Sequence, residues 1–125
     1  MAGNQKDHQR ISIEAEKMII KNNIFENIPR ELPDELSAEI FSGNKFKMER
    51  ILSRGHHSPE GFWYDQDENE WVILLQGSAG LRFAGKGELV VLHPGDYFLI
   101  SRHLRHRVEW TDPDHDTIWL ALYFK

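Results

Sequence analysis

A series of short apolar or alternating segments, separated by turn residues, runs from residue 35 to the end of the chain. Turns such as Gly43-Asn44 and Pro94-Gly95-Asp96 supply the residue types that tight connections between strands favour. About eight or nine short strands at regular spacing are typical of a β-sandwich or β-barrel, so an all-β fold is predicted, with no helix after residue 34. The predicted strands cover 37–42, 45–52, 71–75, 79–83, 89–92, 97–100, 106–110 and 117–124.

The size and charge of the chain limit its function. A chain of 125 residues is expected to form one domain with a single core. The net charge of -5 and the lack of a basic stripe argue against a nucleic-acid partner. Because there is no cysteine, neither disulfides nor thiolate chemistry is available. Residues 1–20 lack the apolar core of a signal peptide, and no run reaches the roughly 18 apolar residues that span a bilayer, so a cytoplasmic protein without a membrane partner is expected.

The N-terminal part differs in character from the rest. Residues 1–21 are predicted to form an arm that is partly flexible, because its first ten residues are polar. Within the arm, residues 11–21 mix charged and apolar side chains, which indicates either a short helix or a segment that packs on a partner chain. Pro29 and Pro33 then punctuate the chain before the strands begin. A β-barrel domain is predicted over residues 22–125.

Two potential metal ligands stand at the edges of apolar strands. Glu70 opens one predicted strand and His106 opens another. If alternate residues such as Val108 and Trp110 face the barrel interior, His106 faces inward as well, at the mouth of the barrel. A carboxylate and an imidazole on one interior face suit a divalent metal such as Fe, Mn, Ni or Zn.

A third ligand is expected from the segment just before Glu70. Asp65 is the best-placed carboxylate there, and a loop could fold His56 over the site. The candidate metal ligands are therefore Glu70, His106, Asp65 and His56. The side chains expected to line the pocket are Tyr64, Gln66, His57 and Trp110. Each has an ordinary alternative: a lone histidine at a strand start is usually structural, a charge run is usually a solvated loop, and aromatic residues usually pack in the core.

At these spacings the chain resembles the cupin superfamily. Glu70 and the glycine that closes its strand have the spacing of the second half of the first cupin motif. In the second motif, Gly95 takes the position of the first glycine and His106 that of the histidine, whereas Trp110 stands where asparagine is usual. The resemblance covers residues 35–124. It implies a double-stranded β-helix, a jelly-roll-like barrel, preceded here by the N-terminal arm.

The main departure from the family pattern is the loss of two histidines from the first motif. Their positions hold Trp63 and Asp65, or Tyr64 and Gln66, depending on whether four or three residues precede the motif glutamate. Only the glutamate and the second-motif histidine carry over as ligands.

The resemblance implies a homodimer and a site in the barrel mouth that holds a divalent metal, a small molecule or both. A metal-dependent enzyme of unknown reaction is one interpretation. The alternative is a non-catalytic small-molecule binding or regulatory module without metal.

Overall fold

The computed structural model describes residues 19–125, and these residues form two antiparallel β-sheets and no helix. The all-β prediction is confirmed, and each predicted strand is present within one or two residues of its predicted ends. No helix in this part of the chain is long and apolar enough to cross a membrane. The strands are β1 (Leu36–Ser42), β2 (Phe46–Ser53), β3 (Asn69–Gln76), β4 (Ala79–Phe83), β5 (Leu89–Leu92), β6 (Tyr97–Ile100), β7 (His106–Thr111) and β8 (Thr117–Phe124).

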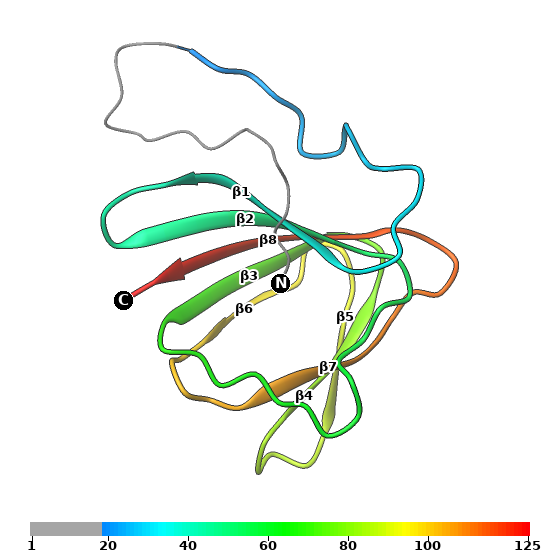
Figure 1. Cartoon of the computed structure of the whole chain (residues 1–125). Coiled ribbons are helices and arrows are strands. Elements are labelled where there is room, and N and C mark those ends of the chain that lie inside the picture. Colours follow the sequence, from blue (N-terminus) through cyan, green and yellow to red (C-terminus); the bar gives the residue numbers. More distant parts are fainter. Residues whose placement is uncertain (1–18) are drawn as a thin grey trace.

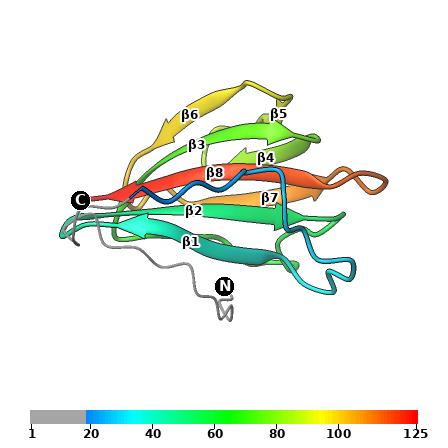
Figure 2. The same ribbon diagram turned by 90° about the horizontal axis from the view of Figure 1, so that it is seen from above.

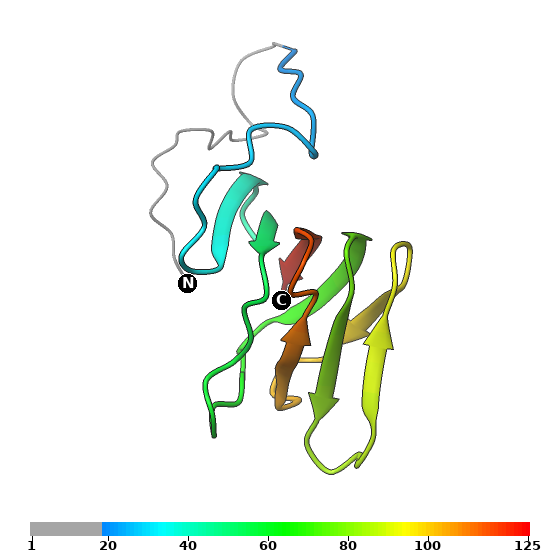
Figure 3. The same ribbon diagram turned by 90° about the vertical axis from the view of Figure 1, so that its right-hand side faces the viewer.

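The two sheets differ in width. The larger sheet has the strand order β1-β2-β8-β3-β6, and the smaller has the order β5-β4-β7. β1 and β2 lie at the far side of the larger sheet from the three-stranded sheet (Figure 1), and the view from the side shows the same separation (Figure 3). As a result, the smaller sheet faces β8, β3 and β6 more closely than it faces the β1–β2 hairpin.

The main core lies between the two sheets. Strand alternation places Val72 and Leu74 of β3 on the same face as Trp119 and Ala121 of β8, because paired residues of neighbouring strands point to one side of a sheet. Leu81 of the smaller sheet packs into the same cluster. All five side chains are almost fully buried. Removal of such apolar surface from water is the dominant favourable contribution to folding.

A second, smaller core lies on the outer face of the larger sheet. There Leu32 packs against Leu52 and Ile118, whose side chains point away from the main core. Figure 2 shows the N-terminal segment passing over this outer face. Two arginines attach the segment to the sheet: Arg50 donates to the carbonyls of residues 24, 26 and 27, and Arg54 donates to those of residues 29 and 30.

The predicted arm, residues 1–21, falls almost entirely outside the described residues, because the description starts at residue 19. Residues 19–35 contain no strand. The proposed helix or partner-binding segment at residues 11–21 therefore stays a prediction.

Candidate functional site

Glu70 and His106 meet in the barrel interior although 36 residues separate them in the sequence. Glu70 lies second in β3 and His106 begins β7, so the two come from different sheets. The Nε2 atom of His106 lies 3.8 Å from Oε1 of Glu70. The exposed fractions of the two side chains are only 6% and 10%. The structure thus brings together the two residues that matched the cupin motifs.

A hydrogen bond to the backbone defines the tautomer of the neutral His106 ring. Its Nδ1 atom lies 2.9 Å from the carbonyl oxygen of Leu104, and a carbonyl can only accept, so Nδ1 carries the hydrogen. The neutral ring then has its free lone pair on Nε2, which faces Glu70. Burial lowers the pKa of His106, and the bond to Leu104 opposes that shift only in part. At neutral pH, His106 is therefore a neutral imidazole whose Nε2 lone pair lies inside the barrel.

Aromatic rings hold the imidazole in place. Tyr64 stacks on His106, with ring centroids 5.4 Å apart, and backbone hydrogen bonds join the two residues in an isolated bridge. On the smaller sheet, Phe83 pairs with His106 in the register of β4 and β7, and its ring centroid lies 6.0 Å away. Contacts of this kind fix both the position and the orientation of the ring.

Glu70 is a buried carboxyl group with two hydrogen-bond partners. The side-chain amide of Gln66 donates to Oε1 of Glu70 at 3.1 Å, and the hydroxyl of Tyr123 bonds to the same carboxyl group. The pKa of Glu70 is raised to about 7, chiefly by burial and to a smaller extent by the charges of Glu49 and Glu35, while the bond from Tyr123 opposes the shift. Glu70 can therefore hold a proton at neutral pH.

The structure distinguishes between the two alignments of the first motif. Tyr64 and Gln66 point toward Glu70 and His106. Asp65 lies between them in the sequence and faces outward, where it bonds to Nδ1 of His103 at 2.8 Å. Its side chain is 52% exposed. Of the pocket-lining candidates, Tyr64 and Gln66 therefore lie at the site, whereas Asp65 does not join the candidate ligands.

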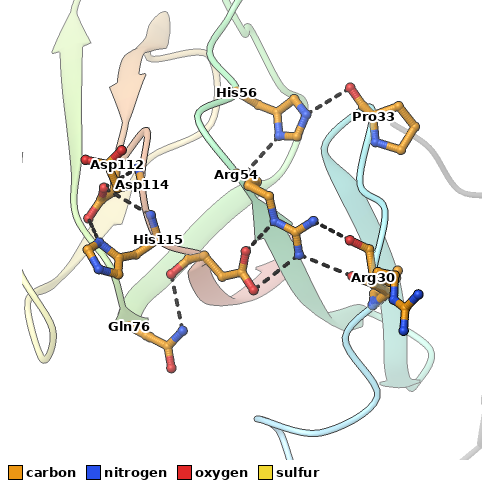
Figure 4. Close-up of polar contacts among 10 residues, drawn as sticks. Arg30, Pro33, Arg54, His56, Gln76, Asp112, Asp114 and His115 are labelled. Atoms are coloured by element: carbon orange, nitrogen blue, oxygen red, sulfur yellow. Dashed lines mark hydrogen bonds and ion pairs between the residues drawn. The ribbon is translucent and has the colours of Figure 1, made fainter.

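His56 and His57 also lie away from Glu70. The ring of His56 bonds to the backbone nitrogen of Arg54 and to the carbonyl of Pro33, next to the ion pair between Arg54 and Asp116 (Figure 4). This cluster follows the C-terminal end of β2, whereas Glu70 lies at the opposite end of the sheet, beside the pair formed by residues 47 and 123. His57 is exposed, and its ring bonds to the carbonyl of Ser58.

Trp110 faces the outside of the smaller sheet because β7 contains a bulge. The register moves from Trp110–Gly80 to Val108–Leu81, so Glu109 is an extra residue in β7. Ala79 and Leu81 are core residues, and Gly80 between them points outward together with Trp110. Strict alternation from His106 had predicted an inward tryptophan, and the inserted residue reverses that orientation.

The side chains at the site meet the needs of a resident metal ion only in part. His106 Nε2 has the free lone pair of a ligand, and the hydrogen bond at Nδ1 is the usual partner of a metal-binding histidine. Glu70 supplies a carboxylate, but the third nearby group is the amide of Gln66. Within residues 19–125, no group of three or more His, Cys, Asp or Glu side chains could hold a metal ion. An imidazole, a carboxylate and an amide do not match the three ligands of a typical open metal site. No chemistry is therefore assigned to a metal here.

Sequence reasoning missed the polar side chains that β1 and β2 point into the barrel. Glu49 pairs with Ala121, which is a core residue, and this pairing assigns alternate residues of β1 and β2 to the interior face. Apart from Ile51, all of these are polar. Together with the half-buried Glu35, which accepts a hydrogen bond from Ser53, they form a surface that we call the polar wall. The polar wall consists of Glu35, Ser37, Glu39, Ser42, Lys47, Glu49 and Ser53.

A signal for the polar wall was present in the sequence. The segment 46–53 reads Phe-Lys-Met-Glu-Arg-Ile-Leu-Ser, in which both sets of alternating positions contain apolar and charged residues. Neither face is therefore plainly the core face. An amphipathic strand normally buries its apolar side. In β2 the segment around Leu32 also covers the outer face, and the strand pattern did not reveal this.

Comparisons with known proteins agree with this architecture. A family model described as "Cupin domain" matches residues 51–123. The crystal structure of a protein from Ralstonia eutropha JMP134, classed provisionally as a mannose-6-phosphate isomerase, is 40% identical, and the match covers 86% of this chain and 99% of that one with a TM-score of 0.83. No curated protein matches the chain.

Two more distant structures share the fold alone. The cupin domain of Cnp3 from Schizosaccharomyces pombe has a TM-score of 0.70 at 11% identity, over 88% of this chain and 72% of that one. The polyketide cyclase RemF from Streptomyces resistomycificus has a TM-score of 0.67 at 18% identity, over 86% and 80% of the two chains.

Proposed function

This chain belongs to the cupin family, and from that premise we propose that its barrel binds a small hydroxylated molecule and moves a proton on it with Glu70 and His106. One observation carries this proposal. The buried Nε2 atom of His106 has a free lone pair, makes no hydrogen bond with the described residues, and lies 3.8 Å from a carboxyl oxygen. A buried acceptor without a donor is costly, so a hydroxyl group of a ligand is a natural partner.

The two side chains have complementary roles as acid and base. His106 is neutral and has a lone pair, so it accepts a proton. Glu70 has a pKa of about 7, so a large fraction carries a proton that it can donate. Burial raises the pKa of Glu70 and lowers the pKa of His106, so the carboxyl group can hold a proton while the imidazole stays free to accept one, and such a pair is typical of general acid–base catalysis.

The reaction class that fits is the isomerisation of a hydroxy-carbonyl compound. In such a reaction, His106 removes the proton from the carbon next to the carbonyl, and Glu70 donates a proton to the carbonyl oxygen, which gives an enediol. Return of a proton to the neighbouring carbon and loss of the hydroxyl proton complete the isomerisation, with no net change in protons. The 40% identical protein from Ralstonia eutropha is classed provisionally as an isomerase of this type, which supports the proposal.

Solvent-proton exchange tests the proposal without knowledge of the natural substrate. Mannose, glucose and fructose are incubated with the protein in deuterated water, and the loss of the proton next to the carbonyl is followed by proton NMR. We expect exchange with at least one of these sugars. Because proton transfer by a positioned side chain typically contributes about 10²–10⁴-fold, Glu70→Gln and His106→Asn should each slow exchange by at least about 100-fold.

His103→Asn is the matched control for this experiment. His103 is exposed and has a φ of 64°, a conformation that asparagine accepts, so the variant should exchange at the rate of the wild type. An absence of exchange with all three sugars, or exchange that neither site variant slows, would contradict the proposed reaction. Binding of a sugar without exchange would support the alternative of a non-catalytic binding module.

Metal content is measured on the same samples, because members of this family often contain metal. The protein is purified without a histidine tag and analysed for Fe, Mn, Ni and Zn. Since the site offers only two typical ligands, we expect the exchange activity to survive dialysis against a chelator. An activity that is lost with the metal and restored by its return would contradict a purely acid–base mechanism.

A further inference from the structure

The loop between β2 and β3 pairs with β7 at two places. The backbones of Tyr64 and His106 exchange two hydrogen bonds. Earlier in the loop, the backbone nitrogen of Ser58 donates to the carbonyl of Val108 at 2.9 Å, and the Ser58 hydroxyl accepts from the nitrogen of Val108 at 3.0 Å. Residues 59–63 therefore lie opposite a single residue of β7, and they must bow away from the strand.

That single residue is Arg107, and its guanidinium group binds the bowed segment. The Nη1 atom donates to the carbonyls of Pro59 and Phe62 at 2.9 and 2.8 Å, and Nη2 donates to the carbonyl of Ser58 at 3.3 Å. Residues 58–62 belong to no strand, so the arginine supplies donors that a neighbouring strand would otherwise supply. A planar group with several fixed donors can do this, whereas the single ammonium group of a lysine cannot.

Glu109, the extra residue of the β7 bulge, fixes the orientation of Arg107. Its Oε2 atom accepts from Nε of Arg107 at 3.1 Å and from Nε of Arg82 at 2.9 Å. The hydrogen bond from Arg82 and the charges of both arginines hold the pKa of Glu109 below its ordinary value, so this carboxylate is ionised at neutral pH. The side chain of Arg107 is only 11% exposed, and Glu109 compensates its charge. Every nitrogen of the guanidinium group is thus engaged.

The loop that Arg107 holds delivers an aromatic ring to the site. Phe62, whose carbonyl accepts from Arg107, lies edge-on against Tyr64, with ring centroids 4.9 Å apart. Tyr64 in turn stacks on His106, with an angle of 25° between the ring planes. Arg107 and His106 are neighbours in the chain, but strand alternation directs them to opposite faces of the smaller sheet. Arg107 therefore reaches the imidazole through the loop.

We propose that Arg107 and Glu109 are positioning residues of the site: they hold the loop so that Tyr64 keeps the imidazole of His106 in the orientation that proton transfer needs. The inference rests on the proposed function for its effect on the reaction rate, whereas the placement of Tyr64 does not depend on any reaction. Both residues lie on the outer face of the smaller sheet, so neither is a catalytic residue.

The NMR signals of the His106 ring test the placement of Tyr64 directly. The ring current of a stacked tyrosine displaces the carbon-bound protons of the imidazole, so Tyr64→Leu should move these signals and define the direction of the change. We expect Arg107→Met to move them in the same direction by at least about half as much. Glu109→Gln should give a smaller displacement, because the arginine keeps its bonds to the loop. His106→Asn assigns the signals.

Deuterium exchange then connects the placement to the reaction. With the sugar that the wild type exchanges fastest, Arg107→Met should slow exchange at least about tenfold, because small errors in the position of a reacting group are costly. If Arg107 acts through Tyr64, the double variant Tyr64→Leu/Arg107→Met should be no slower than Tyr64→Leu, since both changes remove the same contact.

Arg82→Met is the matched control. Arg82 bonds to the same carboxylate oxygen as Arg107, but no hydrogen bond joins its side chain to the loop within residues 19–125. The His106 signals and the exchange rate of this variant should therefore match those of the wild type. Circular dichroism checks that each variant is folded. If Arg107→Met does not fold, Arg107→Lys takes its place in each comparison, because it keeps the charge and loses the set of bonds to the loop.

The inference and the proposed reaction can fail separately. Unchanged His106 signals in a folded Arg107 variant would overturn the inference, as would a double variant that is tenfold slower than Tyr64→Leu. Displaced signals in a protein that exchanges no sugar would contradict the proposed reaction and still support the placement of Tyr64 by Arg107. Displaced signals with exchange at the wild-type rate would contradict the role of Arg107 in the reaction.

Discussion

Burial controls the protonation of the two side chains at the centre of the site. Glu70 is pushed toward its neutral, protonated form and His106 toward its neutral, deprotonated form, because a low-dielectric interior disfavours either charge. Single hydrogen bonds then decide the details: Leu104 assigns the tautomer of His106, and Tyr123 and Gln66 orient the carboxyl group. As a result, Glu70 and His106 can both be neutral and can still exchange a proton.

Protein stability should depend on pH through Glu70. Its folded-state pKa of about 7 lies above its ordinary value of 4.5, so this group stabilises the folded state fully below pH 4.5, and the contribution is lost as pH rises through about 7. Glu70→Gln cannot ionise, so we expect the unfolding free energy of the variant to rise relative to the wild type by about 3 kcal/mol between pH 4.5 and 9.

Urea denaturation of both proteins at several pH values measures this difference. His106 titrates in both proteins, and its lowered pKa acts in the opposite direction, since that contribution is lost as pH falls through the folded-state pKa. Glu60→Gln, an exposed residue, should show no such trend. A difference between Glu70→Gln and wild type that stays constant with pH would mean that Glu70 is not shifted.

At the scale of elements, a bulge in β7 decides which side chains face the barrel interior. The extra residue Glu109 in β7 turns Trp110 out of the interior, and there the indole covers Gly80. A Cβ atom on Gly80 would lie 2.3 Å from the indole nitrogen, so only glycine permits this contact. On the outer face of the larger sheet, Arg50 of β2 and Arg54, which directly follows β2, hold residues 24–30 against the sheet.

Arg50 should control the attachment of that segment. Its guanidinium group donates to the carbonyls of Ile24, Glu26 and Asn27, a set of bonds that the single ammonium group of lysine cannot reproduce. We expect Arg50→Lys to destabilise the protein by about 1–3 kcal/mol and to speed amide hydrogen exchange over residues 24–30 at least tenfold.

Arg102→Lys is a suitable control for Arg50→Lys, because Arg102 is exposed and lies in the β6–β7 connection. Hydrogen exchange read by mass spectrometry localises the effect to the segment. Unchanged exchange over residues 24–30 in Arg50→Lys would show that the apolar contacts of Leu32 hold the segment without the arginine.

At the scale of the whole molecule, the larger sheet keeps an apolar edge. Tyr97 and Leu99 of the edge strand β6 are 63% and 60% exposed, and Tyr97 packs against Trp71 of β3 on the same face. Edge strands with large exposed apolar side chains are typical of surfaces that another chain covers. We expect β6 to form part of the interface of the predicted homodimer.

We therefore predict that the protein is a dimer and that the double variant Tyr97→Asp/Leu99→Asp is a folded monomer. Two buried negative charges per subunit would be unpaired in the dimer, which is strongly unfavourable. Light scattering coupled to size-exclusion chromatography measures the mass of both proteins. Leu89→Asp, an exposed apolar site on β5 of the other sheet, is the comparison variant. A monomeric wild type, or a dimer that survives the double substitution, would contradict the prediction.

The sequence alone determined the strand number, the all-β class and the meeting of Glu70 with His106. The strands follow from local signals, because alternation and turn residues act over a few residues at a time, whereas the meeting of Glu70 with His106 was expected chiefly from the resemblance to the cupin motifs. Tertiary structure alone decided the rest: Gln66 rather than Asp65 faces Glu70, a bulge turns Trp110 outward, and the polar side of β2 faces inward. The reason is physical, because which side of a strand becomes buried depends on the segments that cover it, and these are distant in the chain.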